Sequence, residues 1–413
     1  MFDVPTTWEG DLTTTTDIPH FNVSDPSFSV RSPEVIAARE QHWYATTNLG
    51  VAVLRYEEAS ALLKDRRLRQ GSGRWPAHYG ITEGPLAEWW ADMMLSKEGD
   101  DHARLRKLAN PAFAPRLLEA MTPAFTALAN ELVDDFSELG HCEYMSQFAE
   151  PYAARVITTL LGMEDSQWQE VARLSAEFGY AFSVQIADEL PRIDEALAGL
   201  VAMSEELIER KKHDDSGDFM STLVAAQVDG DKLTERELVV MVSLLIFGGF
   251  DTTRNQLGMA MKTFVEHPDQ WELLRHDPDL AKNAVEEVMR VNPTITWVTR
   301  EAVEDFSYKD LSVPAGTTIH LYSIAAGSDP RKFEDPSFDI RETRAPHFGF
   351  GGGIHHCVGH FVARIDMREA LKTLSARMPN LLPNGLAQYL PDSGNTGPMV
   401  LPLAFTPTPK VGR

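Results

Sequence analysis

The chain has 413 residues, 43% of them hydrophobic, with a formal net charge of -23 and two cysteines. This length and composition can bury a large core. The negative charge excludes a general nucleic-acid binder or a protein held on anionic membranes, because phosphates are repelled. Cys142 and Cys357 are far apart, which excludes a disulfide framework and predicts a cytoplasmic protein. Neither a signal peptide nor a membrane-spanning run is expected.

Residues 1–48, rich in Thr, Pro and Ser, are predicted to be an extended N-terminal segment packed on the protein body. A short strand is predicted at 50–56. Apolar side chains then recur every three or four positions, which predicts helices at 56–65, 102–113, 123–139, 165–178 and 190–212. Strands are predicted within 306–326, around a Pro-Ala-Gly turn. Because no linker divides the chain, the sequence predicts a single domain, 1–413, mainly α with small β-sheets.

One long apolar helix is predicted from a capping box at Thr234 to His267. Its middle carries Gly248, Gly249, Asp251 and Thr252. Each glycine costs about 1 kcal/mol relative to alanine, and the polar pair is costly to bury without partners. A kink with hydroxyls bonded to the preceding turn is one explanation. A functional site on this helix is the other.

The loop HFGFGGGIHHCVGH, residues 347–360, places Cys357 behind four glycines and just ahead of a predicted helix. The helix N-terminus favours a thiolate there, and the glycines let a flat group approach the backbone. A buried structural cysteine would not explain the glycines. A zinc site with His355 and His360 would need a fourth ligand, and the Gly-Lys-Ser/Thr of a phosphate loop is absent. Haem iron fits best, since one axial sulfur suffices.

The stretch Phe350-Gly-x-Gly-x-His-x-Cys-x-Gly359 resembles the haem-binding signature of the cytochromes P450 at every fixed position. The resemblance implies the cytochrome P450 fold and haem b, with Cys357 as the iron ligand. By the same resemblance Gly351 and Gly353 shape the loop and His355 reaches a haem propionate.

The central helix resembles the oxygen-binding motif of the same family, Ala or Gly, Gly, x, Asp or Glu, Thr. The resemblance implies that Gly248 and Gly249 bring the helix over the haem, and that Asp251 and Thr252 handle the protons needed for oxygen activation. Monooxygenase chemistry with O2 is the implied function.

Glu287 and Arg290, three residues apart on one helical face, resemble the structural Glu-x-x-Arg motif of the family. The stretch 333–341 resembles its meander, which implies that Arg341 closes a triad with them and that His347 supports it. Two haem propionates need neutralisation.

By resemblance, His102, Arg106 and Arg300 also contact the propionates. The family's substrate segments imply contacts from Trp89, Trp90, Met93, Met94, Phe178, Phe182, Phe247, Ile295, Trp297, Val298, Met399 and Val400. Such an aromatic and methionine lining indicates a bulky apolar substrate, such as a terpenoid, a steroid or an aromatic metabolite.

The sequence offers no flavin or iron-sulfur domain, so a soluble bacterial type of P450 is implied, with NAD(P)H-derived electrons from a separate ferredoxin and its reductase. A basic docking face is expected from Arg104, Lys107, Arg116, Arg331 and Lys332. A monomer is expected. A haem sensor would not need the acid-alcohol pair, and a peroxide-driven enzyme tends to lose it. Desaturation and ring coupling remain alternatives to hydroxylation.

Overall fold

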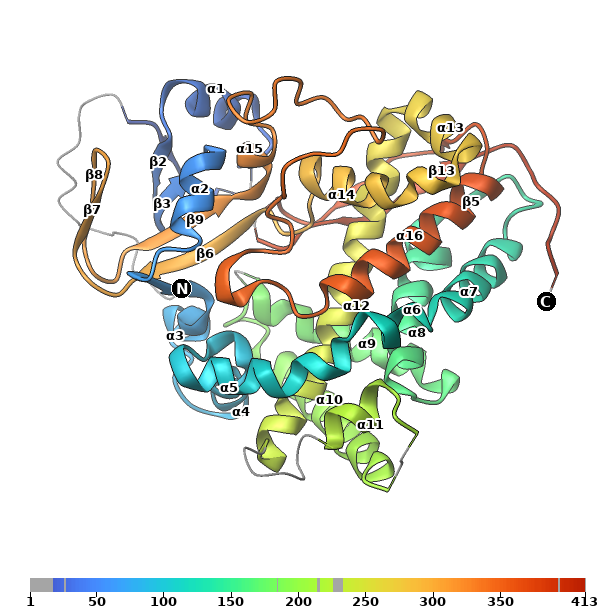
Figure 1. Cartoon of the computed structure of the whole chain (residues 1–413), viewed down its shortest axis with the longest axis horizontal. Coiled ribbons are helices and arrows are strands. Elements are labelled where there is room, and N and C mark those ends of the chain that lie inside the picture. Colours follow the sequence, from blue (N-terminus) through green and yellow to red (C-terminus); the bar gives the residue numbers. More distant parts are fainter. Residues whose placement is uncertain are drawn as a thin grey trace.

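The computed structural model describes residues 18–25, 27–183, 185–213, 216–225, 233–392 and 394–412. Helices dominate and surround a long central helix, α12 (Glu235–Glu266) (Figure 1). The others are α1 (Pro33–Gln41), α2 (Tyr56–Leu62), α3 (Trp75–His78), α4 (Pro85–Asp92), α5 (Gly99–Ala109), α6 (Pro115–Glu119), α7 (Thr122–Asp134), α8 (Glu150–Leu161), α9 (Trp168–Phe178), α10 (Leu190–Lys211), α11 (Phe219–Ala225), α13 (Pro268–His276), α14 (Ala281–Val291), α15 (Ser323–Gly327) and α16 (His360–Arg377). The five helices expected before residue 213 are confirmed as α2, α5, α7, α9 and α10.

The strands form four small sheets among the described residues. The largest has the order β1-β2-β3-β9-β6-β4, and the others are β10-β13-β5, β11-β12 and β7-β8. The strands are β1 (His20–Phe21), β2 (Tyr44–Thr47), β3 (Gly50–Val53), β4 (Leu68–Gln70), β5 (His141–Glu143), β6 (Trp297–Ala302), β7 (Phe306–Tyr308), β8 (Leu311–Val313), β9 (Thr318–Tyr322), β10 (Leu382–Pro383), β11 (Gln388–Tyr389), β12 (Pro398–Val400) and β13 (Pro402–Ala404). The strands expected at 50–56 and 306–326 are therefore confirmed.

The N-terminal segment differs from the expectation of an extended stretch over 1–48. Residues 1–17 lie outside the described part, but residues 33–41 form α1 and β2 pairs antiparallel with β3. Ser32 caps α1 by accepting a hydrogen bond from the Val35 N–H at 3.4 Å, and proline occupies the first turn. These are ordinary helix-start residues. The Thr, Pro and Ser content of the whole stretch concealed them.

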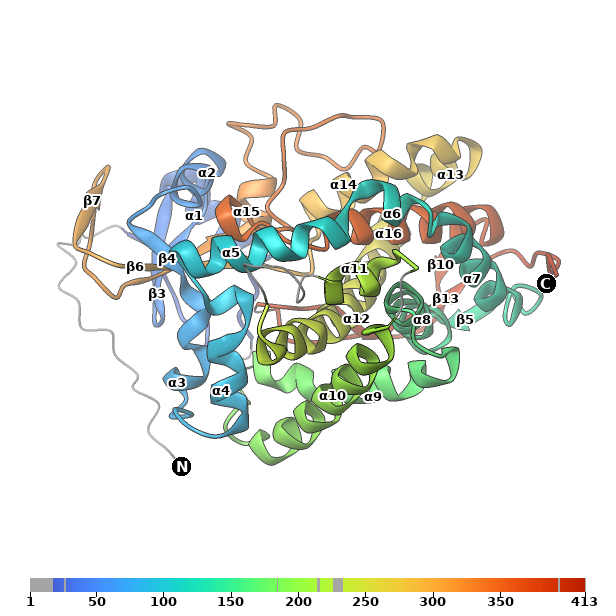
Figure 2. The same cartoon turned by 60° about the horizontal axis from the view of Figure 1, so that its bottom comes forward.

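Helix α12 is 32 residues long and begins at the predicted capping box. The Thr234 side chain accepts from the Glu237 N–H at 3.1 Å, and the Glu237 carboxylate accepts from the Thr234 N–H at 2.9 Å. The helix packs against α8, α9 and α10. Helix α12 passes behind α16 in Figure 1 and beneath α5 in Figure 2. The acid-alcohol motif on α12 and the cysteine loop that leads into α16 therefore lie in neighbouring layers.

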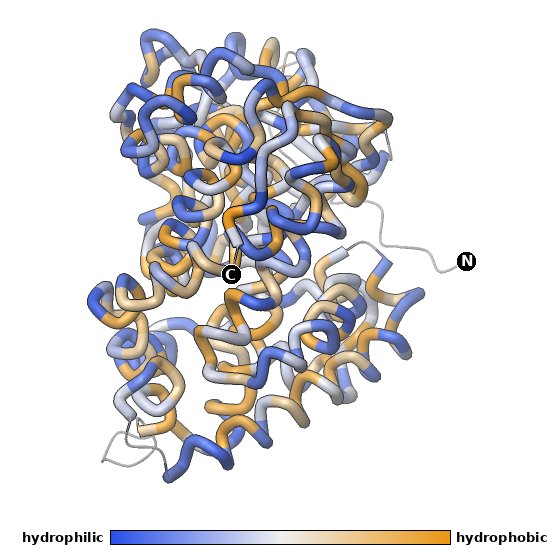
Figure 3. Tube along the Cα trace, turned by 90° about the vertical axis from the view of Figure 1, so that its right-hand side faces the viewer, coloured by the Kyte–Doolittle hydropathy of each residue, from blue (hydrophilic) through white to orange (hydrophobic). Residues whose placement is uncertain are grey.

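The core consists of one large cluster of buried apolar side chains between the helices and two smaller clusters on the six-stranded sheet. Hydrophobic and hydrophilic stretches alternate along the helices in Figure 3, as they do in amphipathic helices. None of the described helices is long and apolar enough to cross a membrane.

Candidate active site

The loop that carries Cys357 folds back on itself before α16. The Cys357 N–H donates to the Phe350 carbonyl oxygen at 3.0 Å. Gly351 and Gly353 have φ angles of 68° and 69°, in the left-handed region that favours glycine. A Cβ on Gly353 would lie 2.5 Å from the Leu63 carbonyl oxygen, so the loop also needs close approach to the end of α2. The predicted glycine loop ahead of a helix is confirmed.

Cys357 has accessible surface although protein surrounds its thiol. The residue is exposed, whereas burial raises the pKa of its thiol. The residue as a whole therefore keeps accessible surface, while protein groups pack around its sulfur. The Gly359 N–H and the guanidinium groups of Arg106 and Arg364 act against burial and favour the thiolate.

One face of α12 also borders free space. Leu244, Gly248 and Thr252 follow at spacings of four and share a helical face, and each is only partly buried in a mostly buried helix. A Cβ on Gly248 would meet no atom within 4 Å. Glycine is needed at position 249 for close helix packing, because a Cβ there would lie 2.6 Å from the Ile157 side chain on α8. The first glycine leaves space and the second allows helix packing.

The polar pair on α12 has distinct partners. Thr252 donates its hydroxyl hydrogen to the Gly248 carbonyl oxygen at 2.6 Å, as the kink explanation anticipated, but the helix is continuous there. The Asp251 carboxylate accepts hydrogen bonds from the side-chain amides of Asn395, in the C-terminal segment, and Asn255, at 3.4 Å. Burial raises the pKa of Asp251 above its ordinary value. No motif or spacing pointed to either asparagine.

Arg300 is held deep in the protein at the start of the cysteine loop. Its guanidinium donates to the Gln70 side-chain oxygen at 2.6 Å and to the Gly352 carbonyl oxygen at 2.9 Å. Burial lowers the pKa of Arg300 to about 10. A guanidinium satisfied only by neutral groups keeps its full positive charge for an anion.

Two histidines and an arginine lie beside the same loop. The rings of His102 and His355 are 4.2 Å apart, and the His355 Nε2 atom lies 3.1 Å from a Glu98 carboxylate oxygen. Burial, followed by the charges of His355 and Arg106, lowers the pKa of His102 to about 4. Burial also lowers the pKa of Arg106. Basic groups therefore crowd one another around a single carboxylate.

These residues fit a haem. Cys357 is an accessible free cysteine held by the glycine loop, open space lies beside Gly248 on α12, and four basic side chains outnumber one carboxylate where two propionates would need positive charge. Within the described residues, no group of three or more His, Cys, Asp or Glu side chains is arranged to hold a metal ion. The zinc alternative for the cysteine loop gains no support.

The Glu287–Arg290 pair is buried, with side chains 2% and 1% exposed. Two guanidinium nitrogens of Arg290 donate to the Glu287 carboxylate at 2.7 and 2.6 Å. Arg290 also donates to the carbonyl oxygens of Gly327, Pro336 and Ser337. The pair therefore joins α14 to the end of α15 and to the irregular segment that leads to the cysteine loop.

The structure does not bring Arg341 into this pair. Arg341 is 64% exposed and binds Asp339 at 2.6 Å. Arg344 takes the expected place, with its Nε atom 3.5 Å from the Glu287 carboxylate. The segment between them has no regular structure, so periodicity could not tell which arginine turns inward.

His347 does not contact the pair either. Its Nε2 atom lies 3.2 Å from a carboxylate oxygen of Glu286, which also accepts two hydrogen bonds from Arg364. Both partners hold the pKa of Glu286 at about 2, against the opposing effect of burial. This second ion-pair group links α14 to the start of α16.

Five of the expected substrate residues form one aromatic cluster between α4, the end of α9 and α12. The ring centroids are 5.0 Å apart for Trp89 and Phe178, 4.7 Å for Trp90 and Phe182, and 5.0 Å for Phe182 and Phe247. The Trp89 indole N–H donates to the Ser243 hydroxyl, on α12, at 2.9 Å. The structure therefore brings these segments together beside the polar pair.

Trp297 lies away from this cluster. It alternates along β6 with Val298, so the two side chains point to opposite faces of the sheet. Trp297 stacks on Tyr322 at 5.7 Å and packs against the N-terminal core, whereas Val298 shares the face of Arg300. The expectation that Trp297 lines the same space is not supported by this placement. Ile295 pairs as an isolated bridge with Asn395.

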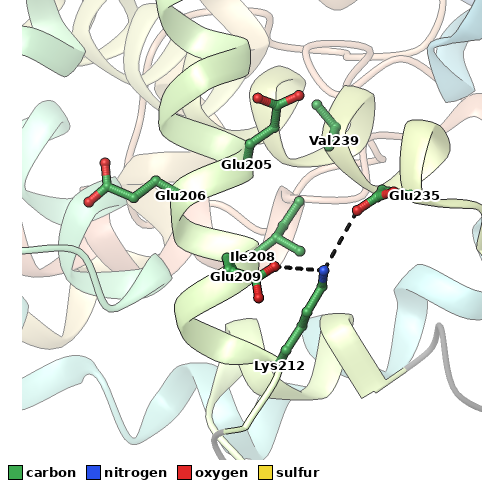
Figure 4. A pocket seen from close by; sticks show the side chains of 7 residues that line it. All are labelled: Glu205, Glu206, Ile208, Glu209, Lys212, Glu235 and Val239. Carbon is green, nitrogen blue, oxygen red and sulfur yellow. Dashed lines mark hydrogen bonds and ion pairs between the residues drawn. The ribbon is translucent and has the colours of Figure 1, made fainter.

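The remaining expected contacts are scattered. Met93 is buried, Met94 and Val400 are half-buried, and Met399 is 44% exposed. A surface groove of about 480 Å3 between α10 and the start of α12 contains none of the expected site residues (Figure 4). There Lys212 binds Glu209 at 2.7 Å and Glu235 at 3.6 Å, while Glu205 and Glu206 point away from it. This groove is a solvated charged face.

Comparison with known proteins agrees with this geometry. The family model described as Cytochrome P450 matches residues 82–375. Luteothin monooxygenase of Streptomyces thioluteus is 37% identical over 394 residues, which are 94% of this chain and 96% of that protein. The 6-deoxyerythronolide B hydroxylase of Saccharopolyspora erythraea is 31% identical over 79% of this chain and 82% of its own length.

A solved structure gives the same result for the fold. The crystal structure of CalO2 superposes with a TM-score of 0.84 at 28% identity, covering 92% of this chain and 99% of that one. The expected fold class is therefore confirmed, and membership of this family implies haem as the cofactor and O2 as the oxidant. This chain belongs to the cytochrome P450 family, whose named relatives are oxygen-inserting oxidoreductases.

Proposed function

We propose that this enzyme inserts one oxygen atom of O2 into a bulky apolar molecule such as a terpenoid, a steroid or an aromatic metabolite. The observation that carries the proposal is the acid-alcohol pair on α12, beside free space on one side and the aromatic cluster on the other. Relatives named as a monooxygenase and a hydroxylase support the reaction. Bound haem supplies the activation of O2; the chain supplies binding, orientation and protons.

Cys357 is the iron ligand in this proposal, because it is an accessible cysteine that the glycine loop holds just ahead of α16. The haem propionates are held by Arg300, Arg106, His102 and His355. The two propionates supply the negative charge that this group of basic side chains lacks. Phe350, Gly351, Gly353 and Gly359 shape the loop. Gly248 and Gly249 set how closely α12 approaches the haem. Gly248 leaves open space beside the helix, and Gly249 lets α12 pack on α8.

Asp251 and Thr252 handle protons. The Thr252 hydroxyl donates to the Gly248 carbonyl oxygen, so its lone pairs remain available to accept a hydrogen bond from a water. Asp251, whose pKa is raised by burial, exchanges protons nearer neutrality than an exposed aspartate does. A proton can therefore pass from Asp251 through water to the site beside Thr252.

Replacing Thr252 with alanine is expected to misdirect proton delivery. Substrate binding and electron uptake should persist, while product per NAD(P)H falls several-fold, within the roughly 10² that acid-base assistance contributes, and hydrogen peroxide accumulates. NAD(P)H consumption, peroxide and product are measured together. Thr263→Ala is the control, since Thr263 makes the same bond, to Met259 at 2.8 Å, farther along α12. Unchanged coupling in Thr252→Ala would leave only a structural role for the pair.

The aromatic cluster supports an apolar substrate class, because Trp89, Phe178 and Phe247 offer ring faces and edges rather than charged groups. Desaturation or ring coupling would use the same lining. A spectral titration with apolar small molecules tests the class. We expect that the ligands that displace water from the haem are apolar. Binding of only small ionic ligands would contradict the proposed substrate class.

Electrons are proposed to come from a ferredoxin and its reductase. Among the expected docking residues, Lys107 and Arg116 are exposed and have no ion pair with another described residue. Arg104 is bound to Glu237, Arg331 to Asp329, and Lys332 to Glu57. Figure 1 shows α5, which bears Lys107, on the near face together with α16. We therefore propose that ferredoxin docks at the surface that bears Lys107 and Arg116.

Charge reversal tests this surface. Lys107→Glu and Arg116→Glu should each slow reduction of the enzyme by ferredoxin roughly tenfold at low salt, with the difference shrinking as salt screens it. The first electron transfer is followed by stopped-flow absorbance. Lys410→Glu, an exposed change near the C-terminus, is the control. Equal rates and equal salt dependence in all variants would place the docking site elsewhere.

A further inference from the structure

The C-terminal segment reaches the acid of the central helix. The Asn395 side-chain amide donates to the Oδ2 atom of Asp251, 144 residues away in the sequence. The other oxygen, Oδ1, receives only a long bond of 3.4 Å from Asn255, one helical turn farther on. The two carboxylate oxygens of Asp251 are therefore unequal: one is firmly bound and one is weakly bound.

Asn395 is itself fixed on both sides. Its backbone forms a bridge with Ile295, and its neighbour Thr396 donates its N–H to the Thr294 carbonyl oxygen at 2.9 Å. The Thr294 hydroxyl shares its one hydrogen between the Asn395 side-chain oxygen, at 2.7 Å, and the Thr396 carbonyl oxygen. An ionised carboxylate can only accept, so the NH2 side of the amide must face Asp251 and the oxygen must face Thr294. Both ends of the amide are thus assigned.

The charges around Asp251 are few. Arg254 is the charged neighbour that lowers its pKa, and Arg254 is itself engaged by Glu150 at 3.3 Å and by the Asn255 oxygen at 3.0 Å. A Cβ on Gly179, at the end of α9, would lie 4.0 Å from the Oδ1 atom of Asp251. The hydrogen bond from Asn395 is thus a main contact that holds the carboxylate.

We propose that Asn395 is a positioning residue for the reaction: it holds Asp251 by Oδ2 and leaves Oδ1 as the oxygen that exchanges protons with water. The inference rests on the proposed proton relay through Asp251 and Thr252. Adjacent residues of a helix project about 100° apart, so Asp251 does not face Thr252 directly and must pass the proton through water. The orientation of the carboxylate then decides whether that water is reached.

The step is balanced. A hydronium ion of the solvent gives its proton to Oδ1 and becomes water. The same oxygen then passes the proton to the water beside Thr252, and Asp251 returns to the carboxylate that Asn395 stabilises. Loss of the amide donor would free the carboxylate to rotate and would stabilise its protonated form. Asn395→Ala should therefore move the alkaline limb of turnover to higher pH.

The experiment uses the holoenzyme, four single variants and one double variant. Asn395→Ala removes the donor, Asn395→Asp keeps the shape but adds a like charge, and Asp251→Asn removes the acid. Asn384→Asp is the control, because Asn384 is exposed in the same C-terminal part. Turnover with its coupling is measured against pH, together with the infrared carboxyl band that Asp251→Asn abolishes. The haem spectrum reports folding.

We expect Asn395→Ala and Asn395→Asp to slow turnover roughly tenfold, with the carboxyl band titrating at higher pH, and the Asp251→Asn/Asn395→Ala double variant to be no slower than Asp251→Asn. A slow Asp251→Asn with normal Asn395 variants, or additive losses in the double variant, would overturn the positioning role and leave the relay standing. An unimpaired Asp251→Asn would overturn the relay itself.

Discussion

Replacing Cys357 with alanine is expected to abolish the thiolate-type absorption spectrum of the reduced carbon monoxide complex and to reduce product formation to background. The reason is chemical: a thiolate donates electron density to the iron that no neutral side chain can replace. The only other cysteine of the chain is Cys142. Burial raises the pKa of Cys142 to about 12, so it stays a thiol.

Cys142→Ala is the matched control. Cys142 lies on β5 opposite Leu403 in a small sheet, and its loss should lower stability slightly while the thiolate spectrum remains. Difference spectra of the reduced carbon monoxide complexes, normalised to bound haem, make the comparison. A thiolate spectrum in Cys357→Ala would contradict the assignment of the iron ligand, because the other cysteine, Cys142, lies on β5.

The features that the sequence predicted well are those with local causes. A positive φ at Gly351 and Gly353, the capping box at Thr234 and the periodicity of α12 each depend on residues within a few positions of one another. Such causes can be recognised in a sequence because backbone conformation and helical faces follow directly from spacing. The position of Cys357 between a glycine loop and a helix belongs to this group.

The features that the sequence did not predict depend on contacts between distant segments. Arg341 and Arg344 lie in one irregular stretch, and only packing against α14 decides which of them approaches Glu287. Trp297 was expected beside the substrate. Side chains alternate between the two faces of β6, and the pairing of β6 with β9 determines the face on which Trp297 lies. Asn395 meets Asp251 only because residues 394–396 pair with 294–296.

The buried ion pair makes the other large prediction. Glu287→Ala is expected to lower the free energy of unfolding by about 3 to 5 kcal/mol, because it leaves the Arg290 guanidinium buried without its counter-charge. Arg290→Ala should cost a similar amount, since it removes the donors of the Gly327, Pro336 and Ser337 carbonyl oxygens. Both variants should lose haem at lower temperature than the wild type.

Glu286→Ala provides the matched control, one residue away on the same helix. Glu286 is 40% exposed, so loss of its pairing with Arg364 should cost far less than loss of the buried pair. Its pKa is depressed to about 2, so its contribution is present above its ordinary pKa near 4.5 and is lost as the pH falls toward 2. The two glutamates thus differ in burial, with Glu287 2% and Glu286 40% exposed.

Unfolding is followed by far-ultraviolet circular dichroism and haem absorbance on the same samples. The expected order of midpoints is wild type, Glu286→Ala, then Glu287→Ala and Arg290→Ala together. A Glu287→Ala enzyme that unfolded with the wild type would mean that Arg290 needs no counter-charge. The three backbone carbonyls alone would then hold α14 against the segment before the cysteine loop, and the geometry of that loop would not depend on the ion pair.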